Sequence, residues 1–489
     1  MQTGVLISLA LYFILMLAIG VYAWRKSTGD SEGYLLAGRS LTPGVAALSA
    51  GASDMSGWLL LGLPGALYLT GLSAAWIGIG LTVGALMNWI VVAPRLRRQT
   101  EELGDALTIP EWLGNRFPGQ ATALRLTSAV IVVAFFTVYT AAGLVGGGKL
   151  FVTAFSDIIG GGYMTGVWVT ALVVLAYTMV GGFLAVSLTD FVQGVIMLLA
   201  LVIMPLVVMF GEGGSSGQSI AAVPQEGFLN LMQGVTFLGG LSAVTWGLGY
   251  FGQPHIIVRF MALRSVSDVP KARAIGMSWM AACLLGAIGV GLAGRAYVER
   301  NGLVLEDPET IFILLANLLF HPLVTGFLYA ALLAAIMSTV SSQLLVSSSS
   351  LTEDFYRLFL RKNASEREAV TVGRVCVALV ALAAIVIAAD PDSEVLGLVS
   401  HAWAGFGAAF GPMVVLALTW RGMTGAGALA GLVTGAAVVV AWIGLGWDTS
   451  FLGGEGIYEI VPGFIAAWLA IVAVSMATRP ASATVKVTA

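Results

Sequence analysis

The chain has 489 residues, of which 58% are hydrophobic and 10% are charged, with a net charge of −3 and a mean hydropathy of +0.93. A soluble domain carries roughly 25% charged residues, so this chain has too few charges to cover a surface that faces water. No basic run suggests nucleic acid as a partner, and two cysteines inside apolar stretches exclude a disulfide framework.

Apolar runs of membrane-spanning length follow one another from the N-terminus. A helix needs about 20 apolar residues to cross the hydrocarbon layer. The first run is followed by Arg25 and Lys26 and by no cleavage site, so we expect an uncleaved span with the N-terminus outside. Thirteen runs have the required length: 4–24, 43–71, 73–94, 122–147, 163–185, 188–210, 232–262, 273–298, 322–350, 371–389, 394–419, 424–446 and 457–477.

The basic residues support this odd number of spans. With the N-terminus outside, only Lys149, Arg295 and Arg300 of the 23 Lys and Arg residues fall on the outer side. Cytoplasmic loops of membrane proteins carry such an excess of positive charge. We therefore expect a multi-pass protein of the bacterial cytoplasmic (inner) membrane, with its C-terminus inside.

Two spans contain residues that break helices. The second has Gly51, Gly57 and Pro64 around Asp54, and the seventh reads VTWGLGYFGQP over residues 244–254. Backbone groups freed at membrane depth must line a cavity inside the protein. Each break opens a set of five spans, 2–6 and 7–11, of opposite sense, which predicts an inverted-repeat transporter. The alternative is that the glycines only allow close helix packing.

The expected organisation is a single integral membrane domain over residues 1–489. Its parts are a first helix with a cytoplasmic loop, repeat 1, repeat 2 and two C-terminal helices, at 1–42, 43–210, 232–419 and 424–477. The chain has no P-loop, HExxH or GxSxG motif, so we expect neither direct use of ATP nor an enzyme. His255, His321 and His401 are far apart in the sequence, and we interpret them as packing or helix-end residues rather than metal ligands.

Oxygen donors indicate a candidate sodium site. Na⁺ prefers oxygen ligands, which unwound backbone and hydroxyl groups provide. Ser338 and Thr339 lie in the middle of the ninth span, where they meet an ion or bond back to their own helix. Asp54 is the clearest ionisable residue at membrane depth, and it attracts a cation or caps the second half of its broken helix. We interpret Asp190, at the start of the sixth span, as a helix N-terminal acid that faces the cytoplasm, with a coupling role as the alternative.

The broken helices also offer a place for a small amino acid. Half-helix ends provide donors for a carboxylate and acceptors for an amine without any full charge. Tyr139, Trp246 and Tyr250 can form an aromatic box around an aliphatic side chain or ring. The alternative is that these aromatic residues only pack helices together.

Six long motifs resemble the sodium/solute symporter family, and its sodium/proline branch in particular. They are ALSAGASDMSGWLLLGLPGAL (47–67), FFTVYTAAG (135–143), GGFLAVSLTD (181–190), WGLGYFGQPHI (246–256), AAIMSTVSSQLL (334–345) and VLGLVSHAWAGFGAAFGP (395–412). The likeness extends from about residue 10 to 475. It implies an all-α membrane protein of thirteen helices, with a LeuT-type 5+5 inverted repeat broken at spans 2 and 7.

The resemblance implies roles for individual residues. The implied sodium ligands are the carbonyl groups of Ala52, Met55 and Ala335 and the hydroxyl groups of Ser338 and Thr339. The implied substrate-binding residues are Ser56, Gly57, Tyr139, Trp246, Tyr250 and Pro254. Accessory coupling roles are implied for Asp54, Asp190 and Arg39. The chain departs from relatives at Ser342 and Thr140, where some of them carry cysteine.

We therefore expect Na⁺-coupled symport of L-proline into the cell by alternating access. Na⁺ is the expected coupling ion, membrane lipid the surroundings, and neither nucleic acid nor an obligate protein partner is expected. One alternative is a Na⁺ symporter for another small solute, such as a vitamin or a monocarboxylate. The other alternative is a membrane sensor of proline. We expect no signalling domain after the last span, which argues against a sensor.

Overall fold

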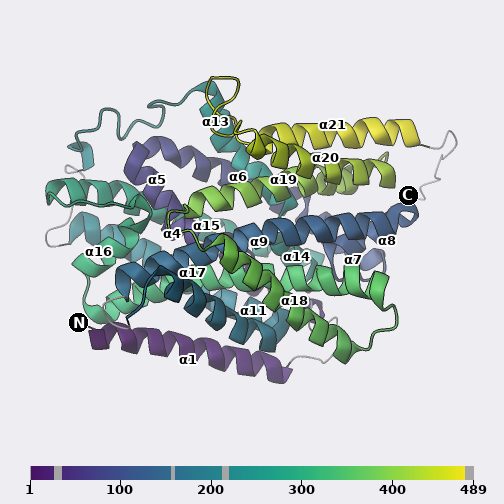
Figure 1. The fold of residues 1–489 in the computed structure, drawn as a ribbon, viewed down its shortest axis with the longest axis horizontal. Coiled ribbons are helices and arrows are strands. Elements are labelled where there is room, and N and C mark those ends of the chain that lie inside the picture. The colour runs from purple at the N-terminus through teal and green to yellow at the C-terminus, as the bar shows by residue number, and fades with distance from the viewer. Residues whose placement is uncertain (1, 27–32, 34–35, 156–159, 212–219, 480–489) are drawn as a thin grey trace.

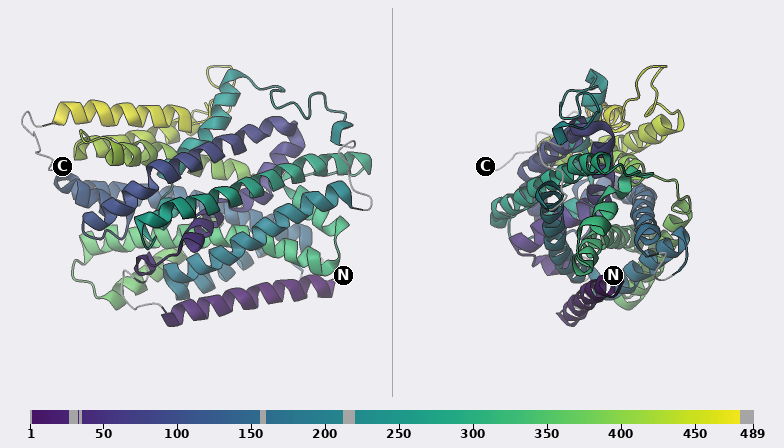
Figure 2. Two further views of the ribbon diagram at one scale, coloured as in Figure 1. Left: turned by 180° about the vertical axis from the view of Figure 1, so that it is seen from behind. Right: turned by 90° about the vertical axis from the view of Figure 1, so that its left-hand side faces the viewer.

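The computed structural model describes residues 2–26, 33, 36–155, 160–211 and 220–479. Within these ranges the long elements are helices that run roughly parallel to one axis of the molecule (Figure 1). Helix α1 (Gln2–Lys26) lies at one side of the bundle, and α20 (Gly425–Gly444) and α21 (Ile460–Thr478) lie at the opposite side. The views in Figure 2 show the same order from behind and along the bundle.

Ten helices in the described part of the chain are long and apolar enough to cross a membrane. The expected spans 43–71, 163–185 and 232–262 do not occur as long helices of their own. The first and third are interrupted. The second runs directly into the next span as α11 (Tyr163–Phe210), which bends at Gly182, where φ is 60°. The count of thirteen spans therefore stays a prediction.

The other long helices differ in how deeply they lie in the bundle. They are α6 (Ala75–Val91), α9 (Ala121–Ala154), α15 (Val269–Arg300), α17 (Pro322–Ser349), α18 (Glu366–Ile387) and α19 (Val395–Thr419). In α19, 89% of the apolar stretch that can span the membrane is buried inside the protein, whereas in α1 only 22% of the corresponding stretch is buried. Helix α19 is therefore central, and α1 presents most of its apolar surface outward, as a lipid-facing helix does.

The first interruption separates α3 (Pro43–Asp54) from α4 (Gly57–Leu60). Met55 leaves the helical region with φ −81° and ψ 74°, and Ser56 is extended. The Ser56 side chain then caps α4, because its hydroxyl oxygen accepts a hydrogen bond from the backbone N–H of Trp58. Polar backbone at this point is buried among protein, as a break at membrane depth requires.

The second interruption occupies the middle of the seventh expected span. A short helix, α13 (Phe237–Val244), is followed by the 3₁₀ helix η4 (Thr245–Gly252) and then by α14 (Pro254–Met261). Gln253 is extended between them, and Pro254 begins α14, where its missing N–H costs no hydrogen bond.

Helix α6 supports η4 through its glycines. A Cβ atom added to Gly84 would lie 2.1 Å from the carbonyl oxygen of Gly247, and one added to Gly80 would lie 2.3 Å from that of Val244. Gly80 and Gly84 form a GxxxG pair, a spacing that lets two helix backbones approach closely. Gly247 of η4 is part of this close contact, because a Cβ atom added to it would lie 2.2 Å from the Gly80 carbonyl oxygen. A glycine of the interrupted span therefore also allows close helix packing, which was the alternative interpretation of the sequence.

Short helices cover the two ends of the bundle. Helices α7 (Ala93–Glu102) and α8 (Ile109–Arg116) lie at one end and α16 (Ile311–Leu319) at the other (Figure 1). Parts of the segments between the first and second expected spans and between the sixth and seventh, and the tail that follows Arg479, lie outside the described residues.

Candidate functional site

Hydroxyl groups of α17 face the end of α3 at the first interruption. The Ser338 hydroxyl donates to the carbonyl oxygens of Ala52, at 2.7 Å, and Ala335, at 3.1 Å. The Thr339 hydroxyl lies 3.5 Å and 3.2 Å from the same two oxygens. Met55 is fully buried at the adjoining turn. The structure thus brings four of the five predicted sodium ligands together and places the fifth beside them.

The interruption explains why the Ala52 carbonyl is available. In a continuous helix it would accept from the N–H of Ser56, but that N–H donates to the Asp54 carbonyl oxygen instead, at 2.9 Å. The freed oxygen accepts from Ser338 and Thr339, which also bond back to their own helix. Carbonyl and hydroxyl oxygens that converge without any full charge suit a hard monovalent cation, for which the hydroxyl groups can turn their oxygens inward.

Asp54 connects the two interrupted helices. Its side chain is buried, with 3% of its surface exposed, and accepts a hydrogen bond from the Tyr250 hydroxyl of η4. Its backbone oxygen accepts from the Tyr139 hydroxyl and from the Trp58 indole, both at 3.3 Å. A carboxylate at membrane depth needs such donors or a cation nearby. Asp54 therefore links α3, α9 and η4 around one point.

Aromatic rings gather on the η4 side of this point. Trp246 stacks on Tyr458, with ring centroids 5.2 Å apart, and its carbonyl oxygen accepts from the Trp403 indole at 2.7 Å. Tyr250 meets the same Trp403 ring edge to face, at 5.0 Å. The structure thus brings Trp246, Tyr250 and, through Asp54, Tyr139 to one region. Trp403 and Tyr458 were not among the predicted residues, because neither stands beside a break in the sequence.

Two of the predicted substrate residues lie at the start of α4. Ser56 caps this helix, and Gly57 packs so closely on α17 that an added Cβ atom would lie 3.1 Å from Ile336. Pro254 is placed elsewhere. It lines a cavity of about 20 Å³ with Phe183 and Val258, whereas none of the three predicted aromatic residues lines this cavity.

The space beside Asp54 is small. Asp54 and Tyr250 line a cavity of about 30 Å³ together with Asn88 of α6 and Trp279 of α15. Such a volume holds about one or two water molecules and is too small for an amino acid. Asp54, Tyr139 and Tyr250 are at most 3% exposed, so these side chains are shielded from solvent in this arrangement.

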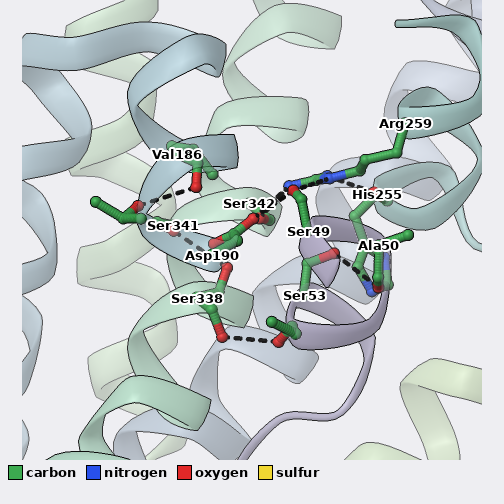
Figure 3. A network of polar contacts seen from close by, with 12 residues as sticks. Ser49, Ala50, Ser53, Val186, Asp190, His255, Arg259, Ser338, Ser341 and Ser342 are labelled. Carbon is green, nitrogen blue, oxygen red and sulfur yellow. Dashed lines mark hydrogen bonds and ion pairs between the residues drawn. The ribbon is translucent and has the colours of Figure 1, made fainter. Parts of the chain in front are cut away.

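The structure corrects the interpretation of Asp190 as a helix N-terminal acid. Helix α11 continues through Asp190, which is fully buried and forms an ion pair with Arg259 at 3.1 Å. Asp190 also accepts from the Ser49 hydroxyl at 2.8 Å, and Arg259 donates to the Ser342 hydroxyl at 2.5 Å (Figure 3). Asp190 therefore faces the interior of the protein, because its side chain is buried against Ser49 of α3 and Arg259 of α14.

Two of the three histidines have the roles expected of them. His255 is fully buried and packs edge to face on Tyr139 and Phe136, with ring centroids 5.8 Å and 5.3 Å apart. His321 caps α17, where its ring nitrogen accepts from the backbone N–H of Leu323. Neither takes part in a group of potential metal ligands in the described part of the chain.

Arg39 forms hydrogen bonds at the end of α14, the second half of the second interrupted helix. It is 8% exposed and donates to the carbonyl oxygens of Met261, at 3.1 Å, and Ala106, at 2.9 Å, and to the Thr100 hydroxyl, at 3.2 Å. It therefore joins the last turn of α14 to the segment that contains α7 and α8. The sequence placed Arg39 in a cytoplasmic loop, and this burial gives it a direct contact with a half-helix.

Comparisons with known proteins agree with this architecture. The model of the "Sodium:solute symporter family" matches residues 34–435. The chain is 52% identical to the "High-affinity proline transporter PutP" of Bacillus subtilis over 469 residues, which cover 96% of this chain and 97% of that protein. It is 51% identical to a "Sodium/proline symporter" of Staphylococcus aureus over 98% of this chain and 94% of that one. The solved structure of a Na⁺-coupled sialic acid symporter in a substrate-bound outward-open state superimposes with a TM-score of 0.81, at 17% identity, over 98% of this chain and 99% of that one. The expected fold class, an all-helical LeuT-type transporter, is thereby confirmed.

Proposed function

The chain belongs to the sodium:solute symporter family, and from this membership and from its two proline-transporting relatives we propose that it moves L-proline into the cell together with Na⁺. The observation that carries the proposal is identity above 50% over nearly the whole length of proteins named as proline transporters. The relatives are transporters, and the proposal contains no catalytic step. We propose the bacterial cytoplasmic membrane as its location, with the N-terminus outside and the C-terminus inside.

Na⁺ binds, in this proposal, between the end of α3 and the middle of α17. The ligands are the carbonyl groups of Ala52, Met55 and Ala335 and the hydroxyl groups of Ser338 and Thr339. Their support is the convergence of Ser338 and Thr339 on the Ala52 carbonyl oxygen, which the break in α3 leaves free, and on the Ala335 carbonyl oxygen of their own helix. Bound Na⁺ then holds α17 against the half-helix α3, and so couples ion binding to the position of the broken helix.

Proline binds next to the ion, between the two interruptions. The freed backbone groups at Ser56 and Gly57 lie close to the carboxylate and amine of the substrate, and Tyr139, Trp246 and Tyr250 surround its ring. Their support is that Asp54 connects Tyr139 and Tyr250, and that Trp403 connects Tyr250 and Trp246. The cavity beside Asp54 must widen before substrate can enter, as alternating access requires.

The ion gradient is a sufficient driving force. A membrane potential of about 100 mV contributes roughly 2.3 kcal/mol for one charge. A tenfold Na⁺ gradient adds about 1.4 kcal/mol. Together they can concentrate proline on the order of several hundredfold at one-to-one coupling.

The test is uptake of radiolabelled proline into proteoliposomes, with and without an inward Na⁺ gradient. We expect uptake to require Na⁺, and Asp54→Ala to lower it at least about 100-fold, because the change removes the buried carboxylate that attracts the ion and leaves the Tyr250 hydroxyl without its acceptor. The matched control is Asp392→Asn, which changes an exposed carboxylate in the loop before α19 and should keep wild-type uptake.

Two outcomes would overturn the proposal. Gradient-driven uptake of another solute, with proline failing to compete, would replace the substrate and keep the fold. Proline binding without any accumulation would indicate a sensor instead of a transporter.

A further inference from the structure

A histidine and two carboxylates come together near the aromatic rings, outside the site described above. They are His401 on α19, Asp448 in the loop between α20 and α21, and Glu459 just before α21. His401 Nδ1 lies 2.7 Å from Glu459 Oε1, and one ligand atom from each of the three residues lies within 4.8 Å of the others. In the predicted topology this cluster lies on the outer side of the membrane.

Neighbouring contacts fix these three residues in place. Tyr458, next to Glu459, donates from its hydroxyl to the carbonyl oxygen of Ser400, next to His401, at 2.9 Å. The loop that carries Asp448 closes on itself, because the N–H of Ile457 donates to the Trp447 carbonyl oxygen at 3.0 Å. These contacts hold the backbone beside the three ligand residues in place, so that only the Asp448 side chain has to move inward when an ion binds. Prearranged outer contacts of this kind strengthen metal binding.

The ligand set has the chemistry of a zinc site. Zn²⁺ binds imidazole and carboxylate at about 2.0–2.2 Å in a tetrahedral arrangement and accepts three protein ligands with water as the fourth. Ligand atoms of such a site lie about 3.3 Å apart, so Asp448 would move inward by roughly 1–1.5 Å. His401 keeps 33% of its side-chain surface exposed, which leaves the cluster open to ions from solution, whereas Glu459 at 2% provides a buried anchor. Ca²⁺ and Mg²⁺ prefer all-oxygen sites and fit an imidazole poorly.

We propose that His401, Asp448 and Glu459 form an inhibitory Zn²⁺ site on the outer face of the protein. The ion ties the α20–α21 loop and the start of α21 to α19. Because Glu459 follows Tyr458, which stacks on Trp246, the ion also holds the Tyr458 ring over η4. Alternating access requires η4 to move, and the bound ion holds it in the arrangement seen here.

Zn²⁺ binding is measured first, because it does not depend on the transport function. Isothermal titration calorimetry of the purified full-length protein with ZnCl₂ should show one bound ion per chain. His401→Gln and Asp448→Asn should each weaken binding at least about 100-fold, since loss of a direct ligand exceeds the 10- to 100-fold effect of losing an outer contact. His321→Gln, the matched control, removes the exposed histidine that caps α17 and should leave binding unchanged. MgCl₂ should give no binding at this site.

Inhibition is measured second, and this arm depends on the proposed transport of proline. External ZnCl₂ should lower Na⁺-driven uptake into proteoliposomes, and EDTA should restore it. His401→Gln and Asp448→Asn should transport without responding to Zn²⁺, and His321→Gln should respond as the wild type does.

Absence of stoichiometric Zn²⁺ binding, or binding that both variants retain, overturns the site. Binding lost in both variants with uptake unaffected by Zn²⁺ overturns the inhibitory role alone. A wild type that binds Zn²⁺ and transports no proline contradicts the proposed function and leaves the site intact.

Discussion

Ser338 makes the shortest contact between α17 and the freed carbonyl group of Ala52, at 2.7 Å. Replacing it with alanine removes one neutral oxygen ligand and keeps the helix intact. A hydrogen-bonding or coordinating contact to a charged species contributes about 1.5–3 kcal/mol. We expect Ser338→Ala to raise the KM for Na⁺ roughly 10- to 100-fold. The maximal rate at saturating Na⁺ should change much less, and initial uptake rates over a range of Na⁺ concentrations measure both quantities.

Ser348 on the same helix is the matched control for this change. Its hydroxyl donates to the Gly373 carbonyl oxygen of α18 at 2.8 Å, far along α17 from the candidate ion site. Ser348→Ala removes an equally buried hydroxyl and should leave the KM for Na⁺ as in the wild type. Equal effects of the two substitutions would indicate that Ser338 only packs or bonds back to its own helix.

At this scale the sequence indicates a candidate residue where local pattern and chemistry coincide. Ser338 and Thr339 stand in a polar run at mid-span, and Asp54 lies between helix-breaking residues, so each is visible in one stretch of sequence. Asp190 was misplaced, since only folding brings it to Arg259. The same holds for Trp403, whose contact with Trp246 joins positions 157 residues apart. A residue defined by a distant partner has no local signal.

At the scale of elements, α6 determines where η4 can lie. Gly84→Ala would place a methyl group 2.1 Å from the Gly247 carbonyl oxygen, a distance that no pair of atoms adopts without a backbone shift. Because the three atoms nearest to the methyl group all belong to the Gly247 backbone, η4 must move and carry Trp246 and Tyr250 with it. We expect proline uptake to fall more than about tenfold, because small displacements of binding groups lower activity to this extent. Uptake normalised to the amount of reconstituted protein measures the effect.

Gly78→Ala on the same helix provides the comparison. A methyl group there would meet only Leu284, at 3.6 Å, which is an ordinary contact. This variant should fold and transport as the wild type does. If Gly84→Ala transports equally well, the close contact between α6 and η4 is not required for the site.

The interrupted elements were predictable in place but not in form. Glycine and proline near residues 51–65 and 247–254 indicated the breaks, because these residues are poor in helix interiors. Composition could not show that the second break is a complete 3₁₀ helix, since its shape depends on the contact with α6. The sequence also could not show that two expected spans join in α11, because a bend at one glycine leaves no polar gap between them.

At the scale of the whole molecule, ion pairs close the bundle at both ends. At the end that carries η6 (Pro308–Thr310), Lys149 of α9 pairs with Asp307 and Glu309, both at 2.8 Å. Glu309 also accepts from the backbone N–H groups of Val395 and Leu396 at the start of α19, each at 3.0 Å. At the opposite end, Arg125 of α9 pairs with the fully buried Asp354 at 2.7 Å. Helix α9 thus carries one closing contact at each end of a site that is itself buried.

Weakening one of these contacts should open the corresponding end. Lys149→Met leaves the carboxylates of Asp307 and Glu309 close together without their cation. Removing one partner of a buried pair costs about 3–5 kcal/mol, which corresponds to a shift of roughly 100-fold or more in the equilibrium between closed and open forms. Spin labels at Val304→Cys and Leu452→Cys, both strongly exposed at this end, report the separation of its two sides. With Cys283 and Cys376 replaced, we expect the longer separation to become the main population in pulsed electron paramagnetic resonance.

The control for this experiment is Arg295→Gln, which breaks the Arg295–Glu299 pair on α15. That pair is partly exposed and joins two residues of one helix, so its loss costs about 0–1 kcal/mol. The Arg295 guanidinium also lies over the Tyr68 ring of α5 (Gly62–Thr70), at 4.9 Å, but the substitution leaves Lys149 and its two carboxylate partners unaltered. The distance distribution should stay that of the unsubstituted protein. If Lys149→Met gives the same distribution as Arg295→Gln, the contacts around Glu309 do not hold this end closed. The bundle would then be held closed by apolar packing around α19, which is buried along most of its length.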